Sequence, residues 1–177
     1  MQRIIRRAVA LLPVVLLAAV TSVWADSDTL ITVNAKIALL TTDGVSVSDV
    51  KVDSHSGAVT LHGKVKSEAE KAKAETVIKK VDGVKSVQNL LQVVPASIRN
   101  AVNASDSQLK EQVTAALRAD ATLRGCDVKV TSVDAGVVLL SGNAQSLEQK
   151  LEAIERAYSV RGVVRVASEI RAPISTE

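Results

Sequence analysis

The pattern of apolar and polar positions repeats along this chain with a period of almost eighty residues. Residues 49–52 read Asp-Val-Lys-Val and return at 127–130, an offset of 78, whereas the offset from Gly57 onward is 79. The one-residue change falls where we expect a turn, because turns tolerate insertions better than strands. Self-similarity of this kind indicates a duplicated domain. The later matches pair Gly57, Val59, Leu61, Gly63, Gly83 and Val84 with Gly136, Val138, Leu140, Gly142, Gly162 and Val163.

Each copy begins with apolar residues at the spacing of an amphipathic helix. In the second copy this helix is expected from Gln108 to Asp120. A stripe of this kind predicts the face that packs against the rest of the domain. The expected core positions are Leu30, Val33, Ile37 and Leu40 in the first copy and Leu109, Val113, Ala116 and Leu117 in the second.

A hairpin of two antiparallel strands is predicted next. β-Branched residues up to Val52 form its first strand, and Val59, Leu61 and Val65 form the second by alternation. Residues 53–57, Asp-Ser-His-Ser-Gly, have the composition of a turn. The same pattern in the second copy predicts a second hairpin.

The second helix of each copy has the clearest start signal. Ser67 with Glu70, and Ser146 with Gln149, fit a capping box, in which the hydroxyl and the longer side chain satisfy free backbone N–H groups. Apolar stripes at helical spacing follow both boxes. The expected core positions are Ala74, Val77, Ile78 and Val81 in the first copy and Leu147, Leu151, Ile154 and Tyr158 in the second.

The order helix, strand, strand, helix, strand predicts an α+β fold. Gly83 and Gly162 lie just past the second helices, where a left-handed residue commonly ends a helix. The crossover through that helix makes the third strand parallel to the second, so each three-stranded sheet is mixed and both helices cover one face. The expected boundaries are 26–95 for the first domain, 96–105 for a linker, 106–173 for the second domain and 174–177 for a C-terminal tail.

Residues 1–25 have the features of a cleaved signal peptide. A basic start with Arg3, Arg6 and Arg7 precedes an apolar run, and the segment ends in Val-Trp-Ala. The run is shorter than the roughly 20 residues that span a bilayer, which makes an uncleaved anchor the weaker alternative. We expect export to the periplasm, with no transmembrane segment in the mature chain.

Charge and composition narrow the range of partners. The net charge of +3 belongs entirely to the three arginines of the predicted signal peptide, so residues 26–177 are neutral overall. Proteins that bind single-stranded nucleic acid stack bases on aromatic side chains. Tyr158 is the only aromatic residue after residue 25, and it is expected in the core. We therefore expect no nucleic-acid partner.

Charges within the first copy are separated along the sequence. Residues 26–53 carry a local charge of −3 and residues 64–85 one of +3. The lysines admit two interpretations: a solvated helix face with alternating signs, or a surface that meets anionic phospholipid headgroups or another partner. The lysines of this candidate surface are Lys64, Lys66, Lys71, Lys73, Lys79, Lys80 and Lys85.

The sequence contains no recognisable catalytic or metal-binding motif. His55 falls in the predicted turn, and His62 is out of phase with Val59 and Leu61, so both are expected to face solvent. Cys126, the one cysteine, cannot form an intramolecular disulfide. We expect a half-buried thiol at a strand entry, with an intermolecular disulfide or a reactive thiol as the alternative. No cofactor, metal ion or enzymatic activity is expected.

The spacing of glycines and valines resembles the BON domain family. The pattern is Gly-x-Val-x-Leu-x-Gly-x-Val over residues 57–65, followed by Val-x-Gly-Val-x-x-Val-x-Asn-Leu over residues 81–90. The second copy keeps most of these positions, but Ala144 replaces a strand valine and Ser168 replaces the asparagine. The family's structural glycines correspond to Gly57, Gly63, Gly83, Gly136, Gly142 and Gly162.

This resemblance implies a function as well as a fold. It implies tandem domains of helix-strand-strand-helix-strand order, no enzymatic activity, and protection of the envelope under osmotic or other stress. Such proteins are thought to associate with phospholipid surfaces or to act as periplasmic chaperones for unfolded or outer-membrane proteins. The alternative is a structural adaptor that docks on an outer-membrane or envelope protein complex.

Overall fold

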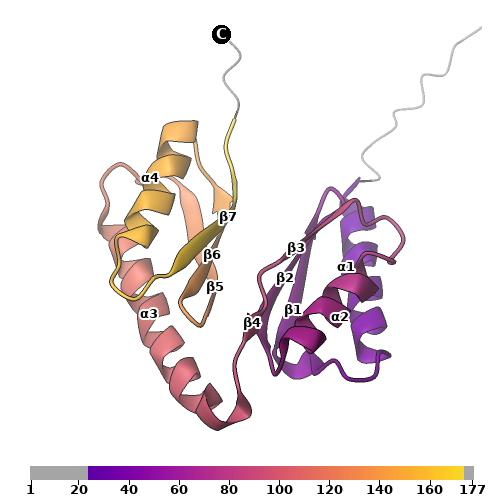
Figure 1. Ribbon diagram of the computed structural model, residues 1–177. Coiled ribbons are helices and arrows are strands. Elements are labelled where there is room, and N and C mark those ends of the chain that lie inside the picture. Colours follow the sequence, from indigo (N-terminus) through magenta and orange to yellow (C-terminus); the bar gives the residue numbers. More distant parts are fainter. Residues whose placement is uncertain (1–23, 174–177) are drawn as a thin grey trace, which may run out of the picture.

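The computed structural model describes residues 24–173 (Figure 1). The predicted signal peptide and C-terminal tail lie outside the described residues, apart from Trp24 and Ala25, which begin the first helix. The first domain contains α1 (Trp24–Leu40), a 3-10 turn (Val47–Asp49), β1 (Val50–His55), β2 (Ala58–Val65), α2 (Glu68–Ile78), β3 (Ser86–Asn89) and β4 (Gln92–Val93). A 3-10 turn (Ala96–Ile98) leads to α3 (Arg99–Ala119), β5 (Asp127–Asp134), β6 (Val137–Asn143), α4 (Leu147–Tyr158) and β7 (Arg165–Arg171).

Each domain contains the predicted mixed sheet. β1 and β2 are antiparallel, with Val52 opposite Leu61, and β3 runs parallel to β2, with Val59 opposite Val87. The short strand β4 continues the parallel pairing with β2. The second sheet has the order β5-β6-β7 and the same strand directions. The α+β fold with two tandem domains is confirmed.

The two sheets lie between the helices (Figure 1). α1 and α2 cover the outer side of the first sheet, and α3 and α4 cover the outer side of the second. Each domain therefore has its own core between helices and sheet, in which Leu61 and Ile78 are fully buried in the first domain and Val113 and Leu140 in the second. The opposite faces of the sheets point toward the middle of the molecule.

The hairpin turn is shorter than predicted, and the extra residue of the second copy does not lie in it. Ser56 and Gly57 alone join β1 to β2, with φ values of 52° and 84°. Residues 135 and 136 form the same two-residue turn, with φ values of 48° and 79°. This geometry matches the twist of the flanking strands and admits no added residue. The insertion is instead at Thr131, where the register of β5 shifts as in a β-bulge.

One carboxylate ties the first helix of each domain to the hairpin turn. Asp106 accepts hydrogen bonds from the N–H groups of both turn residues, Ala135 and Gly136, at 2.9 and 3.2 Å. Asp28 does the same in the first domain, at 2.7 and 3.1 Å. The two aspartates are 78 residues apart, so the repeat of the sequence itself indicates that they share this role.

The face of α1 that packs against the sheet is not the predicted one. The helix buries Ile31, Ala35 and Leu39, which are matched at the constant offset of 78 by the buried residues of α3. Those residues of α3 are Leu109, Val113 and Leu117, as predicted. The predicted stripe of α1 is exposed: Leu30 by 61%, Val33 by 46%, Ile37 by 51% and Leu40 by 66%. Side-chain size favours the exposed face of α1, whereas the register of the repeat indicates the buried one.

The buried face of α4 also differs from prediction. Ala153 and Ala157 are fully buried, and they match Ala74 and Ile78 of α2 at the offset of 79. From the predicted stripe, Ile154 alone packs against the core. The others are exposed: Leu147, Leu151 and Tyr158. The expectation that Tyr158 lies in the core is therefore wrong, because small side chains form the contact of α4 with the sheet.

Two substitutions in α4 test this assignment. Replacing the exposed Leu151 with lysine is expected to change the free energy of unfolding by less than about 0.5 kcal/mol. Replacing the fully buried Ala153 with leucine is expected to lower it by about 1–3 kcal/mol, because the added atoms have no space. Urea unfolding followed by circular dichroism measures both. The reverse order of effects would restore the stripe predicted from the sequence.

The connection between the domains is helical where a linker was expected. α3 already begins at Arg99, after the 3-10 turn, and continues through the expected start at Gln108. The Arg99 guanidinium pairs with Asp49 of the first domain and donates a hydrogen bond to the carbonyl of Val94. The start of α3 is thereby attached to the first domain.

Candidate functional site

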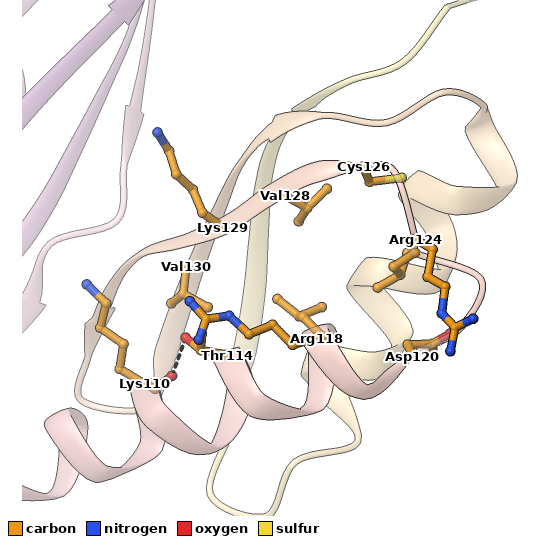
Figure 2. Close-up of a pocket in the computed structure, with 11 residues that line it drawn as sticks. Lys110, Thr114, Arg118, Asp120, Arg124, Cys126, Val128, Lys129 and Val130 are labelled. Atoms are coloured by element: carbon orange, nitrogen blue, oxygen red, sulfur yellow. Dashed lines mark hydrogen bonds between the residues drawn. The ribbon is translucent and has the colours of Figure 1, made fainter.

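A groove between α3 and the edge strand β5 is the candidate binding site of the second domain (Figure 2). It has a volume of about 400 Å³. Leu117, Leu123 and Val130 are buried and give the groove an apolar floor. Val128 and Cys126 are half-buried beside them. The groove thus combines buried apolar surface with an opening to solvent.

Three cationic side chains line this groove. Lys110 and Arg118 come from α3, and Arg124 comes from the loop between α3 and β5, whereas the side chain of Lys129 on β5 points away from the groove toward the first domain (Figure 2). The Lys110 Nζ donates a hydrogen bond to the carbonyl oxygen of Thr131, the extra residue of β5, at 3.3 Å. Within residues 24–173, no ion pair joins the other two cations to a carboxylate. Their charges are available to an anionic ligand.

The acidic residue that lines the groove is occupied by other groups. Asp120 accepts hydrogen bonds from the hydroxyl and the backbone N–H of Thr122, at 2.6 and 2.9 Å, and pairs with Arg156 at 2.6 Å. The bonds from Thr122, followed by the Arg156 guanidinium, lower the pKa of Asp120 to about 2. Its negative charge is therefore balanced by Arg156, not by the cations of the groove.

The first domain lacks this arrangement of cations. At the constant offset of 78, the cationic positions Lys110, Arg118 and Arg124 are matched by the uncharged Thr32, Leu40 and Ser46. The groove was missed in the sequence because its cations are contributed by two separate segments, whereas density of charge along the chain finds only clusters within one segment. Comparison of the two copies position by position would have found it.

The predicted lysine surface of the first domain contains one residue that does not belong to it. Lys64 is only 8% exposed, because the second domain covers it. Among the others, Lys79 pairs with Glu75 at 2.6 Å, which neutralises part of the local charge. Lys71 is half-buried and the exposed members are Lys66, Lys73, Lys79, Lys80 and Lys85. A role for these lysines in binding stays a prediction.

His62 is buried, contrary to prediction, with 3% exposure. The alternation of β2 correctly assigns it to the face opposite Leu61, but the second domain covers that face. Its Nε2 lies 2.9 Å from Asp53 Oδ2, and its Nδ1 lies 3.9 Å from Asp134 Oδ2 in the second domain. His55 is exposed, as expected.

The other predicted residues lie as follows. Cys126 is half-buried at the entry of β5, and its thiol donates a hydrogen bond to Gln149 Oε1 at 3.0 Å. The six glycines that carry the family resemblance all have positive φ. Within residues 24–173 there is no group of three or more His, Cys, Asp or Glu residues suited to a metal ion. None of the described helices has both the length and the hydrophobicity to cross a membrane.

Comparison with known proteins identifies close relatives of both domains. The model of the BON domain family matches residues 27–95 and 105–173. The osmotically inducible protein Y of Escherichia coli (strain K12) is 35% identical over 145 residues, which cover 81% of this chain and 72% of that protein. The outer membrane lipoprotein DolP of Haemophilus influenzae is 36% identical over 117 residues, which cover 66% and 59% of the two chains. The solved structure of CdsD, a structural protein of the type III secretion system of Chlamydia trachomatis, aligns over 79% of this chain and 90% of that chain with 12% identity and a TM-score of 0.31.

Proposed function

This chain belongs to the BON domain family, with two copies of the domain in tandem, and from that premise we propose that it protects the cell envelope under stress by binding anionic phospholipid headgroups in the groove of its second domain. The role is non-enzymatic. Its similarity to an osmotically inducible protein and to an outer membrane lipoprotein supports a place in the periplasm. The predicted signal peptide is consistent with that location.

The observation that carries this proposal is the combination of cations and apolar floor in one groove. Arg118 and Arg124 have no carboxylate partner in the described part of the chain, and the buried floor offers contact to a glycerol backbone or an acyl chain. Each cation near an anionic membrane surface contributes on the order of 1 kcal/mol to binding. Arginine suits phosphate in particular, because its planar donors match two phosphate oxygens.

Vesicle sedimentation tests the proposal with the mature chain, residues 26–177. Binding is expected for vesicles that contain phosphatidylglycerol and not for pure phosphatidylcholine, and it should weaken with salt because surface charges are screened. Replacing both Arg118 and Arg124 with glutamine should weaken binding about 30-fold, the equivalent of about 2 kcal/mol.

The exposed lysines of α2 supply the matched control. Replacing Lys73 and Lys80 with glutamine removes the same number of charges outside the groove. We expect this variant to bind within about threefold of the unaltered protein, apart from a general loss of charge attraction. Equal weakening by the two double variants would instead support the lysine surface predicted from the sequence. Equal binding to the two kinds of vesicle would exclude headgroup recognition.

A second candidate function, chaperone activity toward unfolded outer-membrane proteins, is favoured by the exposed apolar face of α1. Leu30, Ile37 and Leu40 are each more than half exposed and follow one another along the helix. Contiguous exposed apolar side chains are characteristic of sites that bind other molecules. Replacing Leu30 and Ile37 with serine should abolish suppression of aggregation of an unfolded outer-membrane protein, while vesicle binding is retained. Absence of suppression by the unaltered protein in molar excess would remove this candidate.

A further inference from the structure

Two cations of the first domain are buried against carboxylates of the second. The Lys64 Nζ lies 2.9 Å from Asp106 Oδ2 and 3.2 Å from Asp134 Oδ1. His62, two residues earlier on β2, lies between Asp53 of its own domain and Asp134 of the other. Lys64, His62, Asp106 and Asp134 are all less than 9% exposed. Charges from both domains thus meet largely shielded from water.

A small apolar contact adjoins these charges. Leu90, from the first domain, packs against Leu139 and Ala167 on the inward face of the second sheet. All three are buried, at 4%, 1% and 8% exposure. This cluster is separate from the cores of the two domains. Separation of the domains would therefore expose apolar side chains without disturbing either core.

The carboxylates keep His62 positively charged. Burial alone lowers the pKa of an imidazole, but Asp134 and Asp53 outweigh that effect and raise the pKa of His62 to about 9. Lys64 is subject to the same opposition: burial lowers its pKa, whereas Asp106 and Asp134 raise it above the ordinary value. Lys64 therefore keeps its charge at a pH where His62 has lost its own.

The balance of charge around His62 depends on its proton. The charged groups that face it from the packed elements are Lys51 and Asp53 on β1, Lys64 on β2, Asp134 on β5 and, through Lys64, Asp106 on α3. Lys129 on β5 lines a cavity with Asp53 but is exposed to solvent, as is Lys51. With His62 protonated, two buried cations face three carboxylates. Without that proton Lys64 is the one buried cation that faces them, and like charges in a buried site repel one another.

The repeat shows that these two cations are specific to the contact. At the offset of 79, His62 and Lys64 are matched by Ser141 and Asn143, which carry no charge. Asp134 is matched by His55. The first domain alone therefore supplies the two buried cations, His62 and Lys64, and the second domain alone supplies the carboxylate of Asp134.

We propose that His62 and Lys64 form a latch between the two domains, which alkaline pH opens, and that opening exposes the apolar contact of Leu90, Leu139 and Ala167. The direction follows from the sign of the shift. A group whose pKa is higher in the closed form than in the open form stabilises the closed form below its pKa in the open form and loses this contribution as pH rises toward about 9. Asp53 remains beside His62 after opening, so the contribution is the attraction to Asp134 less the cost of burying His62. A difference of about one unit in the pKa of His62 between the closed and open forms changes the closing constant about tenfold.

The accessibility of single cysteines to a thiol reagent tests the latch in the mature chain. Cys126 is replaced by serine, and one cysteine is placed at Ala167 in the contact, at Ala157 in the core of the second domain, or at the exposed Val164. Rates are divided by that of the exposed site, which corrects for ionisation of the thiol. Between pH 7 and pH 10, the relative rate at position 167 should rise about tenfold, while that at position 157 should stay unchanged.

Two histidine variants separate the latch from other effects of alkaline pH. His62→Gln should label rapidly at position 167 at pH 7 and show no further rise, whereas His55→Gln, at the exposed histidine, should behave as the unaltered protein does. Asp134→Asn removes the carboxylate that the second domain contributes to the same contact, and it should also raise the labelling rate at position 167 at pH 7. A rise at position 167 that matches the rise at position 157 would indicate unfolding and overturn the proposal. A rise in labelling at position 167 with pH that persists unchanged in both His62→Gln and Asp134→Asn would overturn the proposal as well. If either variant does not fold, the pH dependence of labelling at position 167 with His62 and Asp134 intact decides whether the latch exists.

Discussion

Replacing Gly63 with alanine is expected to lower the free energy of unfolding of the first domain by at least about 4 kcal/mol. Two causes add. The residue has a φ of +118°, a conformation that an L side chain rarely adopts, and a Cβ built there would lie 1.8 Å from the carbonyl oxygen of Asp49. That oxygen belongs to the backbone, so it cannot move aside without disrupting the start of β1. Because a domain of about 65 residues is only marginally stable, the substitution should leave it largely unfolded, as measured by urea denaturation and circular dichroism.

Gly44 is the matched control for this substitution. Its φ of +77° is also positive, but the nearest atom to a Cβ there is the flexible Lys73 Nζ, at 3.6 Å. Gly44→Ala should therefore cost only the conformational penalty, about 1–2 kcal/mol. Gly142 occupies the same place in the second domain as Gly63 in the first, with a φ of +122° and 1.7 Å to the carbonyl of Asp127. Equal effects at Gly63 and Gly44 would show that the close approach of the strands has no energetic consequence.

The repeated pattern predicted most of the fold because both copies obey the same local physics. Ser67 and Ser146 each accept a hydrogen bond from the N–H three residues later, as the capping boxes predicted. The prediction failed where a choice between two helix faces depended on side-chain size. In α4 two alanines form the buried face while Leu147 and Leu151 stay exposed, and size alone favours the opposite face. Strict use of the offset between the copies resolves this choice.

The candidate sites were less predictable, because they depend on contacts between elements that are distant in the sequence. Alternation placed His62 on the correct face of β2, but periodicity within one strand carries no information about a second domain that covers that face. For the same reason Lys64 was assigned to a surface when it is buried. The groove is assembled from α3, β5 and the loop between them, so Arg118 and Arg124 belong to no single motif. The signal that identifies such sites is a charged residue in one copy of the repeat whose matched position in the other copy is uncharged.

Replacing Lys64 with alanine is expected to lower the free energy of unfolding by about 3–5 kcal/mol. The substitution leaves Asp106 and Asp134 buried without their shared cation. The protein then loses the attraction between Lys64 and the two carboxylates and also bears the cost of keeping their negative charges buried without Lys64. Asp106 also holds the turn of the second hairpin through Ala135 and Gly136, so the effect should extend into the second domain. Urea unfolding measures the loss, and the two domains should separate into two transitions if the contact was what joined them.

Two further variants define what this result means. Lys66→Ala removes an exposed lysine two residues along the chain and should change stability by less than about 0.5 kcal/mol. Adding Asp134→Asn to Lys64→Ala removes one of the two stranded carboxylates, so the double variant should be more stable than Lys64→Ala alone, with a coupling of about 0.5–3 kcal/mol. Strictly additive losses would mean that Lys64 and Asp134 act independently, and the buried charges would then contribute to each domain separately instead of joining the two.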